Sequence, residues 1–578
     1  MVSHMTSSLK KIFPDSSPGK LLKKIPPDLQ ERLSTLTSLV EEQLPGSCGG
    51  FSDTYAALCD FNEIPFREEI QWDIDNIYRI HNWQQFNLLD FCHLDSRDLA
   101  LAVAALSYNQ WFIKIYCKEL RLSADVQQQL IFLLSRSPSL EELSLEASGL
   151  KLDFAIKMAA ALRDHATSSL HSINLSANQI EDKGVIALSQ ELGNLAVGLR
   201  HLSLSRVSMS ARGLGFLCQE LSTCQLFSAS LTHLDLSGNP GSLATEEATF
   251  LFRFLSSCNS LSHLDLSGTD CPLDTLFVSL SAGCCSKLIH LNLARNPFSH
   301  RKVREVTRSI REFFSQSCEL KYVGLSATKL PPQALRLLLQ GLATNARLCG
   351  LELDLSSCEL RSAGAQVIQE HIFEAMAISS LDISDNGFEN DMVTLVLSIG
   401  RCHSLRRLAL GRNFAMKSRA LTDVLHRIAQ LIQDEECPLQ SLSLCDSKLK
   451  TGTGILISSL GGDASLVELD ISGNAIGDTG AKILAKALLS NTRLKTLIWD
   501  RNNVTARGFQ DMADALERNF TLQQVSLPLA DVTQSYRSNP DRTKEALHKI
   551  QRCLQRNNQR QSEGMELQQE FRTQHPEK

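Results

Sequence analysis

The sequence lacks any run of about 18 consecutive apolar residues, the length that a membrane-spanning helix needs. It also lacks an excess of basic residues, because 58 lysines and arginines are outnumbered by 64 acidic residues and the net charge is −6. A general nucleic-acid-binding protein needs a dominant basic face to release counterions from phosphates. These two absences exclude a membrane-spanning protein and argue against a general nucleic-acid binder.

The chain has 17 cysteines but no CxxC pair, and the adjacent Cys284 and Cys285 have no partners at zinc-ligand spacing. No secretory signal peptide opens the sequence. We therefore expect free thiols in a reducing cytosol. The first residues, MVSHM, resemble a remnant of an expression vector, so we expect the natural chain to begin elsewhere.

Motifs of catalysis are missing as well. The sequence has no P-loop, no GxSxG elbow, no HExxH and no GxGxxG after a strand. We therefore predict a protein that is not an enzyme, with no cofactor, no catalytic residues and no dedicated metal ligands.

What the chain does contain is repetition. The phrase LTHLDLSGN returns as LSHLDLSGT and LVELDISGN, and the pattern LxxLxLxx(N/C/T)xL occurs fourteen times at intervals of 27 to 34 residues. This is the long form of the leucine-rich repeat. The units start at Leu140, Leu170, Leu199, Leu231, Leu261, Leu288, Leu320, Leu348, Ile378, Leu405, Leu439, Leu466, Leu494 and Leu522.

Each unit should form a short strand followed by a helix. In the strand of the fourth unit, Leu234 and Leu236 should point inward while His233 and Asp235 point outward, because side chains alternate. The rest of a unit has helical period, as in residues 478–491. Stacked units predict an α/β leucine-rich-repeat horseshoe, with parallel strands on its concave face and helices on its convex face.

The turn after each strand has its own signature. Seven units place asparagine there, whose amide can satisfy backbone groups of the turn. Val207 and Ala530 take that place in two other units, so those two turns should be irregular. The eighth unit fits only with two residues inserted before Leu353, which predicts a bulge.

An open array needs caps at both ends. At the C-terminal end a helix should close the array through Leu547, Ile550 and Leu554, with a frayed or interrupted helix from about Gln559. The chain is therefore divided into vector residues and a basic linker (1–50), an N-terminal cap with possible degenerate repeats (51–135), the repeat array (136–535), and a capping helix and tail (536–578).

One polar pattern marks the strands as a candidate binding site. His201, His233, His263 and His290 occupy the same outward position in four successive repeats, and Asp235, Asp265 and Asn292 follow two residues later. The pattern predicts a protein-recognition strip, pH-sensitive because imidazoles beside carboxylates titrate near neutrality. The alternatives are solvated side chains copied along with the repeat, and a metal site.

Two basic groups are further candidates for binding an acidic partner or a lipid headgroup, although solvated surface charges are the simpler interpretation. Arg406, Arg407 and Arg412 should lie on the concave side of the tenth repeat. A basic patch should surround one helix and comprises Arg301, Lys302, Arg304, Arg308 and Arg311.

Several segments outside the repeat consensus resemble a known family. CGGFSDTYAALCD, REEIQWDIDNIY, FNLLDFCHLDSRDL, YNQWF and WDRNNVTARGFQDMADALERNFTL are similar to the CARMIL family, the capping protein, Arp2/3 and myosin-I linkers, and the resemblance covers about residues 9–555. It implies a cytoplasmic, cytoskeleton-associated scaffold of a regulator of actin assembly, peripheral at the plasma membrane and the leading edge.

In that family a tail beyond the repeats binds heterodimeric actin capping protein, a preceding domain binds membrane lipids, and a region beyond the repeats dimerises. The resemblance places all three outside this chain, and leaves protein partners on the concave face as the expected ligands. Two alternatives from other classes stay open: a leucine-rich-repeat GTPase activator, and a generic protein-binding or inhibitor solenoid.

We predict that this chain alone does not bind capping protein tightly and does not uncap filaments, because none of its residues match the basic capping-protein-interaction motif. Elongation of capped filaments from their barbed ends measures this. Uncapping by residues 1–578 would contradict the prediction.

Overall fold

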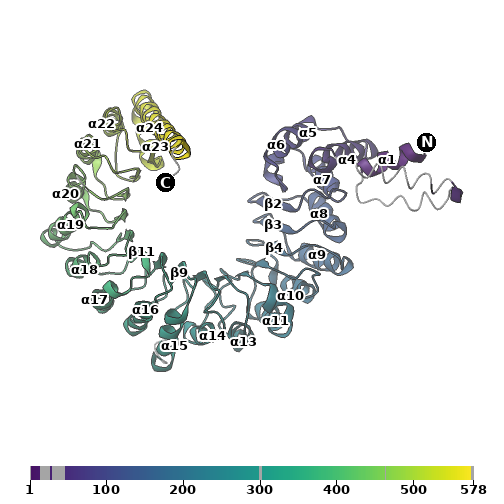
Figure 1. Cartoon of the computed structure of the whole chain (residues 1–578), viewed down its shortest axis with the longest axis horizontal. Helices are drawn as coiled ribbons and strands as arrows, with labels where there is room; N and C mark the ends of the chain where they lie inside the picture. Colours follow the sequence, from purple (N-terminus) through teal and green to yellow (C-terminus); the bar gives the residue numbers. More distant parts are fainter. Residues whose placement is uncertain are drawn as a thin grey trace. The chain divides into compact units, whose positions relative to one another are not determined.

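The computed structural model describes residues 2–12, 26–28, 31, 46–298, 303–462 and 464–574. The chain divides into two compact units. The first comprises residues 1–272 with 282–288, and the second comprises residues 273–281 with 289–578. Each unit is a layer of short parallel strands beside a layer of helices (Figure 1).

Seven strands of the first unit pair in chain order, every pair parallel and in register. They are β1 (Gln85–Asn87), β2 (Lys114–Lys118), β3 (Glu142–Glu146), β4 (Ser172–Asn174), β5 (His201–Ser203), β6 (His233–Asp235) and β7 (His263–Asp265). Its α-helices are α1 (Val2–Ile12), α4 (Ser47–Phe61), α5 (Glu68–Asp73), α6 (Arg79–His81), α7 (Ser96–Leu106), α8 (Ala124–Arg136), α9 (Leu152–Asp164), α10 (Glu181–Leu192), α11 (Ala211–Thr223), α12 (Gln225–Ser230) and α13 (Thr249–Ser256).

Nine strands of the second unit also pair parallel in chain order. They are β8 (His290–Asn292), β9 (Tyr322–Gly324), β10 (Leu351–Asp354), β11 (Ile378–Asp382), β12 (Arg407–Ala409), β13 (Ser441–Ser443), β14 (Glu468–Asp470), β15 (Thr496–Ile498) and β16 (Gln524–Val525). Its α-helices are α14 (Leu273–Gly283), α15 (Val303–Gln316), α16 (Pro332–Thr344), α17 (Arg361–His371), α18 (Met392–Ile399), α19 (Ser418–Gln433), α20 (Thr453–Ser458), α21 (Gly477–Leu488), α22 (Ala506–Leu516), α23 (Leu529–Ser538) and α24 (Pro540–Gln574).

The core of each unit lies between its strands and its helices. Leu234 of β6 and Leu236 just after it are buried, while His233 and Asp235 are half-buried on the opposite face. On α21 the buried side includes Ala481, Leu484 and Leu488. The alternation and the helical period predicted from the sequence are therefore confirmed, and the polar strand positions lie on the face away from the helices. No helix among the described residues is long and apolar enough to span a bilayer.

Buried asparagines hold the turns together. Asn239 donates its amide to the carbonyl oxygens of Leu204 and Leu236, both at 2.9 Å, and its Oδ1 accepts from Val207 N at 3.0 Å. One side chain thus bonds to backbone groups of its own turn and of the turn in the preceding repeat. The predicted role of this position is confirmed at all seven asparagines, which are buried: Asn178, Asn239, Asn296, Asn386, Asn413, Asn474 and Asn502.

The turn at Val207 is regular, so the prediction of an irregular turn there is wrong. Arg206 adopts the left-handed conformation (φ 53°) found at the same corner in Ala177 (φ 57°), and its N–H donates to Ser237 O at 2.9 Å. Valine is tolerated because Asn239 of the next repeat accepts a hydrogen bond from the backbone N–H of Val207. Ala530 lies inside α23, where a helix replaces the turn.

The bulge predicted for the eighth unit lies elsewhere, because the irregularity is a register shift in the pairing of β10 with β11. Leu351 pairs with Ile378, but the next residue, Glu352, pairs with Ser380. The residue without a partner in this register is Ser379, so the bulge belongs to β11 rather than to the eighth unit itself.

The N-terminal part contains a helix where the sequence suggested a linker, and it contains strands of the kind expected from degenerate repeats within residues 51–135. Residues 2–12 form α1, which packs on α4, and Thr54 Oγ1 donates a hydrogen bond to Ile12 O. Residues 13–25 of the predicted linker lie outside the described residues. Two further strands, β1 and β2, lie within 51–135 and bury Phe86 and Ile115, so the ladder begins before the first consensus repeat.

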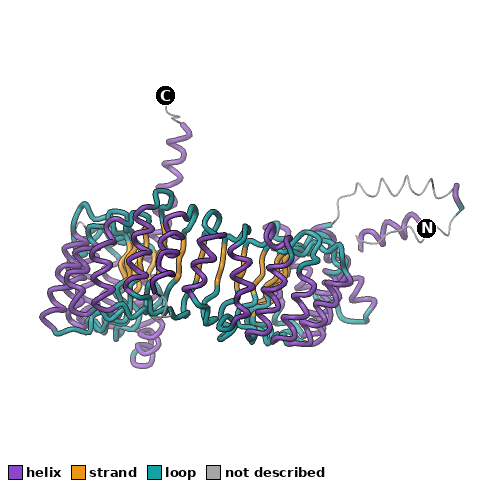
Figure 2. Tube along the Cα trace, turned by 90° about the horizontal axis from the view of Figure 1, so that it is seen from below, coloured by secondary structure: helices purple, strands orange, loops and turns teal. Residues whose placement is uncertain are grey.

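Helix α24 packs on α22 and α23 at the end of the array. Its buried side comprises Thr543, Ala546, Ile550, Cys553 and Asn557, whereas the predicted Leu547 and Leu554 are only half-buried. The helix runs unbroken to Gln574, contrary to the frayed segment expected from Gln559, since its Glu, Gln and Arg residues favour helix. Figure 2 shows its last turns extending past the rest of its unit.

We predict that Asn239→Ala lowers the free energy of unfolding by about 2–4 kcal/mol, because it leaves buried backbone groups of two turns without partners. Denaturant unfolding followed by circular dichroism measures the loss. The matched control is Asn194→Ala, which removes an exposed amide bonded only to Gln190 O. Equal effects of the two substitutions would contradict the role of the buried asparagines.

Candidate functional site

Three histidines stand in one row on the strand face of the first unit. His201 pairs in register with His233, and His233 with His263. The ring centroids of each pair are 4.0 Å apart, with interplanar angles of 33° and 10°. All three are half-buried. We call this row the histidine strip.

Hydroxyl groups orient two of these rings. Thr232 Oγ1 lies 2.8 Å from His233 Nδ1 and Ser262 Oγ lies 2.8 Å from His263 Nδ1. Each hydroxyl also lies within hydrogen-bond distance of a carbonyl oxygen, Thr232 Oγ1 at 3.1 Å from Arg200 O and Ser262 Oγ at 3.2 Å from Thr232 O. The hydroxyls therefore fix the orientation of the two rings, whichever ring nitrogen carries the proton.

The aspartates beside the strip hold the turns. Asp235 Oδ1 accepts from Ser237 N at 3.0 Å and from Ser237 Oγ at 2.6 Å, and Asp265 Oδ1 accepts from Ser267 N at 3.0 Å. A second oxygen, Asp235 Oδ2, accepts from Ser203 Oγ at 3.5 Å. These carboxylates shape the end of each strand as well as adding negative charge next to the imidazoles.

The strip favours the neutral form of His201. Burial lowers the pKa of this imidazole from its ordinary value, an effect that Glu142 opposes and that His171, His263 and Arg200 reinforce. A proton on one ring of a stack spaced at 4.0 Å would also repel a proton on the next. Burial and the closeness of the neighbouring ring thus both act against a charged His201.

The other predicted strand residues belong to the second unit. His290 stacks on Tyr322 with centroids 4.6 Å apart, and Asn292 Oδ1 accepts from Ala294 N at 3.1 Å. Arg407 on β12 and Arg412 in the turn after it are exposed, and Arg407 Nη1 lies 3.3 Å from Glu468 Oε2. Arg406 precedes β12, and its Nη1 donates to His403 O at 2.9 Å.

The predicted basic patch is described only in part. Arg301 and Lys302 lie outside the described residues, as does the side chain of Arg304 on α15. Arg308 is exposed and its Nε lies 3.3 Å from Glu312 Oε1, one turn along the same helix. Arg311 is exposed as well. These two arginines are solvated charges on the outer side of α15.

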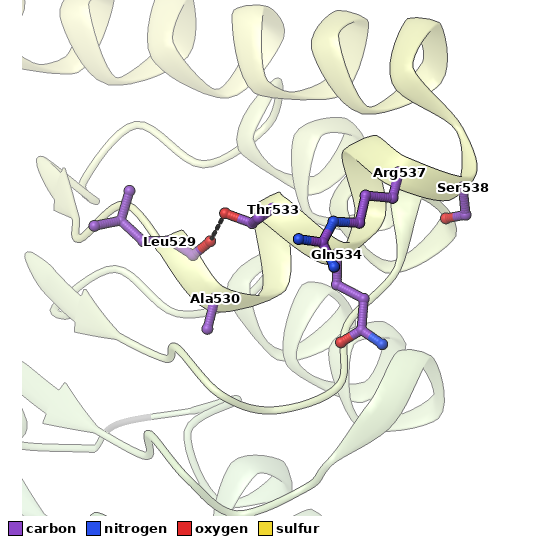
Figure 3. Close-up of a pocket in the computed structure, with 6 residues that line it drawn as sticks. All are labelled: Leu529, Ala530, Thr533, Gln534, Arg537 and Ser538. Carbon is purple, nitrogen blue, oxygen red and sulfur yellow. Dashed lines mark hydrogen bonds between the residues drawn. The ribbon is translucent and has the colours of Figure 1, made fainter.

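A hollow of about 820 Å³ lies against α23, but it brings together no reactive groups. The six residues that line it, drawn in Figure 3, all belong to this one helix. Thr533 Oγ1 donates to Leu529 O at 2.7 Å, so its hydroxyl is already satisfied. Among the described residues, no set of three or more His, Cys, Asp or Glu side chains is placed to hold a metal ion.

Sequence reasoning missed several partners of the predicted residues. Thr232 and Ser262 orient the imidazoles, Tyr322 stacks on His290, and Arg501 shares a carboxylate with Arg412. The contacts of Thr232 and Ser262 could have been predicted, because a hydroxyl residue directly precedes the histidine in both LTHLD and LSHLD.

Parallel strands alternating with helices, buried leucines and an asparagine at the turns define a leucine-rich-repeat solenoid protein. The family described as "CARMIL family, LRR domain" matches residues 48–559. The chain therefore belongs to the CARMIL family.

Named relatives agree with this membership. The chain is 51% identical to human "Capping protein, Arp2/3 and myosin-I linker protein 3" over 566 residues, which are 97% of the chain and 41% of that protein. It is 50% identical to mouse "Capping protein, Arp2/3 and myosin-I linker protein 2" over 97% of the chain and 41% of that protein. "Protein CARMIL" of Dictyostelium discoideum is 32% identical over 91% of the chain and 50% of its own length. The chain thus spans half or less of these relatives.

We predict that acid destabilises the chain partly through His201. Because its folded pKa is lowered, the unfolded chain takes up a proton at this residue more readily, so stability falls as pH drops through about 6.5 and below. Between pH 7.5 and 5.5, the midpoint temperature of thermal unfolding should therefore fall by less in His201→Gln than in the wild type. The control is His426→Gln, at an exposed position on α19. An unchanged pH dependence in His201→Gln would contradict this prediction.

Proposed function

We propose that this chain is the non-enzymatic, protein-binding scaffold of a regulator of actin assembly at the leading edge. Family membership supports this, since the relatives are named as linkers of capping protein, Arp2/3 and myosin-I. On this proposal the repeats hold a rigid binding surface, and regions of the whole protein act on actin assembly. The chain works without a cofactor.

One observation carries the proposal that the strand face is the binding surface. The polar strand side chains stand in rows, in register from one repeat to the next, on the side of each unit that helices do not cover (Figure 1). The histidine strip combines closely spaced ring faces with polar ring nitrogens, groups that suit contact with a protein surface of mixed apolar and polar character. Such preorganised aromatic groups lose little conformational entropy on binding.

We predict that His233→Ala with His263→Ala weakens binding of an actin-regulatory partner several-fold, while stability changes by less than about 1 kcal/mol because both side chains are partly exposed. The measurement is a quantitative pull-down from cell lysate with purified chain, followed by binding of the identified proteins in purified form. The matched control removes two exposed histidines outside the strand face, His426→Ala and His548→Ala.

Two outcomes would count against the proposal. If both double variants retain the same actin-regulatory proteins, the histidine strip is not the binding surface. If the wild-type chain retains no actin-regulatory protein at all, the scaffold role loses its support.

A further inference from the structure

Four successive repeats of the second unit stack their turn corners into a charged row. The corner residue adopts a left-handed backbone in each, with φ between 54° and 71°, and strands β12 to β15 pair in register beside it. We call this row the arginine corner. Its members are Arg412, Asp446, Gly473 and Arg501.

A single carboxylate orients both arginines of the corner. Asp446 Oδ2 lies 3.3 Å from Arg412 Nη2, and Asp446 Oδ1 lies 2.7 Å from Arg501 Nη1. Arg501 comes two repeats after Asp446 and reaches it across Gly473. A Cβ at Gly473 would stand 2.1 Å from Asp446 Oδ1, so a side chain there would displace the carboxylate. One negative charge is thus shared between two guanidinium groups.

What this corner presents outward is positive charge. The side chains of Arg412 and Arg501 are 57% and 54% exposed, against 22% for Asp446. Lys448 and Lys450, in the turn after Asp446, are exposed too. These basic groups face solvent on a chain whose net charge is −6.

The other acids near the corner are half-buried and bind the backbone. Asp478 Oδ1 accepts from Thr505 N at 2.8 Å, and Asp500 Oδ1 accepts from Arg501 N at 2.7 Å. Their lone pairs are therefore directed at the chain itself, and they offset the outward positive charge only partly.

We propose that the arginine corner binds an acidic segment of a protein partner, with the carboxylates of that segment accepting from the outward N–H groups of Arg412 and Arg501. A guanidinium carries five donors in a planar fork that fits a carboxylate, and Asp446 accepts from one nitrogen of each. In an extended peptide, acidic residues at i and i+2 project from one face about 6.8 Å apart. Two acidic side chains on one face of a peptide can therefore each approach one of the two guanidinium groups that bond to Asp446. The site is separate from the histidine strip and goes beyond the function proposed above.

A peptide fits the corner better than a lipid surface does. Membrane-binding segments concentrate about four to eight basic residues. Here the four basic residues Arg412, Lys448, Lys450 and Arg501 stand beside three acids, Asp446, Asp478 and Asp500, so these seven residues together carry a charge of only +1. Recognition at this site therefore depends on the geometry of two oriented guanidinium groups rather than on a large excess of charge.

The test uses fluorescence anisotropy of a labelled peptide in which glutamate alternates with serine, titrated with the chain at low ionic strength. We expect saturable binding that weakens as salt is added. Arg412→Ala with Arg501→Ala should weaken binding at least about tenfold, as expected for loss of close interfacial charge pairs. Gly473→Ala, which removes no charge, should also weaken it, because the carboxylate that orients both arginines is displaced.

The matched control is Arg206→Ala in the first unit. Arg206 has the same left-handed corner conformation (φ 53°), a similar exposure of 60% and one ion pair, to Glu146 at 3.3 Å, but no second arginine at that carboxylate. This substitution should leave peptide binding unchanged. Thermal unfolding of every variant establishes that it is folded.

Several results would overturn the proposal. They are no binding of the glutamate peptide, equal losses in the control and in the double variant, and equal binding of a peptide with lysine in place of glutamate. Binding of the chain to vesicles of phosphatidylcholine and phosphatidylserine that is lost in the double variant would assign the corner to lipid instead.

Discussion

Every repeat brings the backbone of a tight turn into the interior. The buried N–H and C=O groups of that turn need hydrogen-bond partners, and the rest of the structure depends on this constraint. Asn239 bonds the turns of two neighbouring repeats at once, and Asn474 does the same with Leu444 O and Ile471 O. At the units that carry this asparagine, the shared bonding ties a repeat to the one before it. The strands can then pair without slippage, and their outward side chains form rows.

The rows create both candidate sites. Registered pairing places the imidazoles of His201, His233 and His263 face to face, and it stacks the left-handed corners so that Arg501 reaches Asp446. Neither arrangement exists within one repeat, since the contacting residues come from repeats about thirty or more positions apart in sequence. A binding surface of this kind belongs to the stack and not to any single unit.

The period of leucines and the turn asparagines were enough to predict the solenoid from the sequence, because strand alternation and turn bonding are local properties. Prediction failed where a neighbouring repeat decides the outcome. Val207 has a regular turn because Asn239 of the next repeat accepts a hydrogen bond from its backbone N–H. Helix α24 packs on α22 and α23 with Ala546 and Cys553 buried, which its own sequence pattern did not indicate. The row of histidines could be predicted because side chains alternate along a strand. The pairing of Arg412 and Arg501 with Asp446 depends on backbone conformations at the corners, which no sequence motif predicts.

The strand face and the helical side of a repeat are independent in length. Helix α19 spans 16 residues and α20 only six, yet β12, β13 and β14 pair residue for residue. Residues can therefore be added to or removed from the outer half of a repeat while the chemistry displayed on its strand stays in place. The two sides of such a protein are free to diverge separately, one keeping an old ligand while the other acquires a new surface.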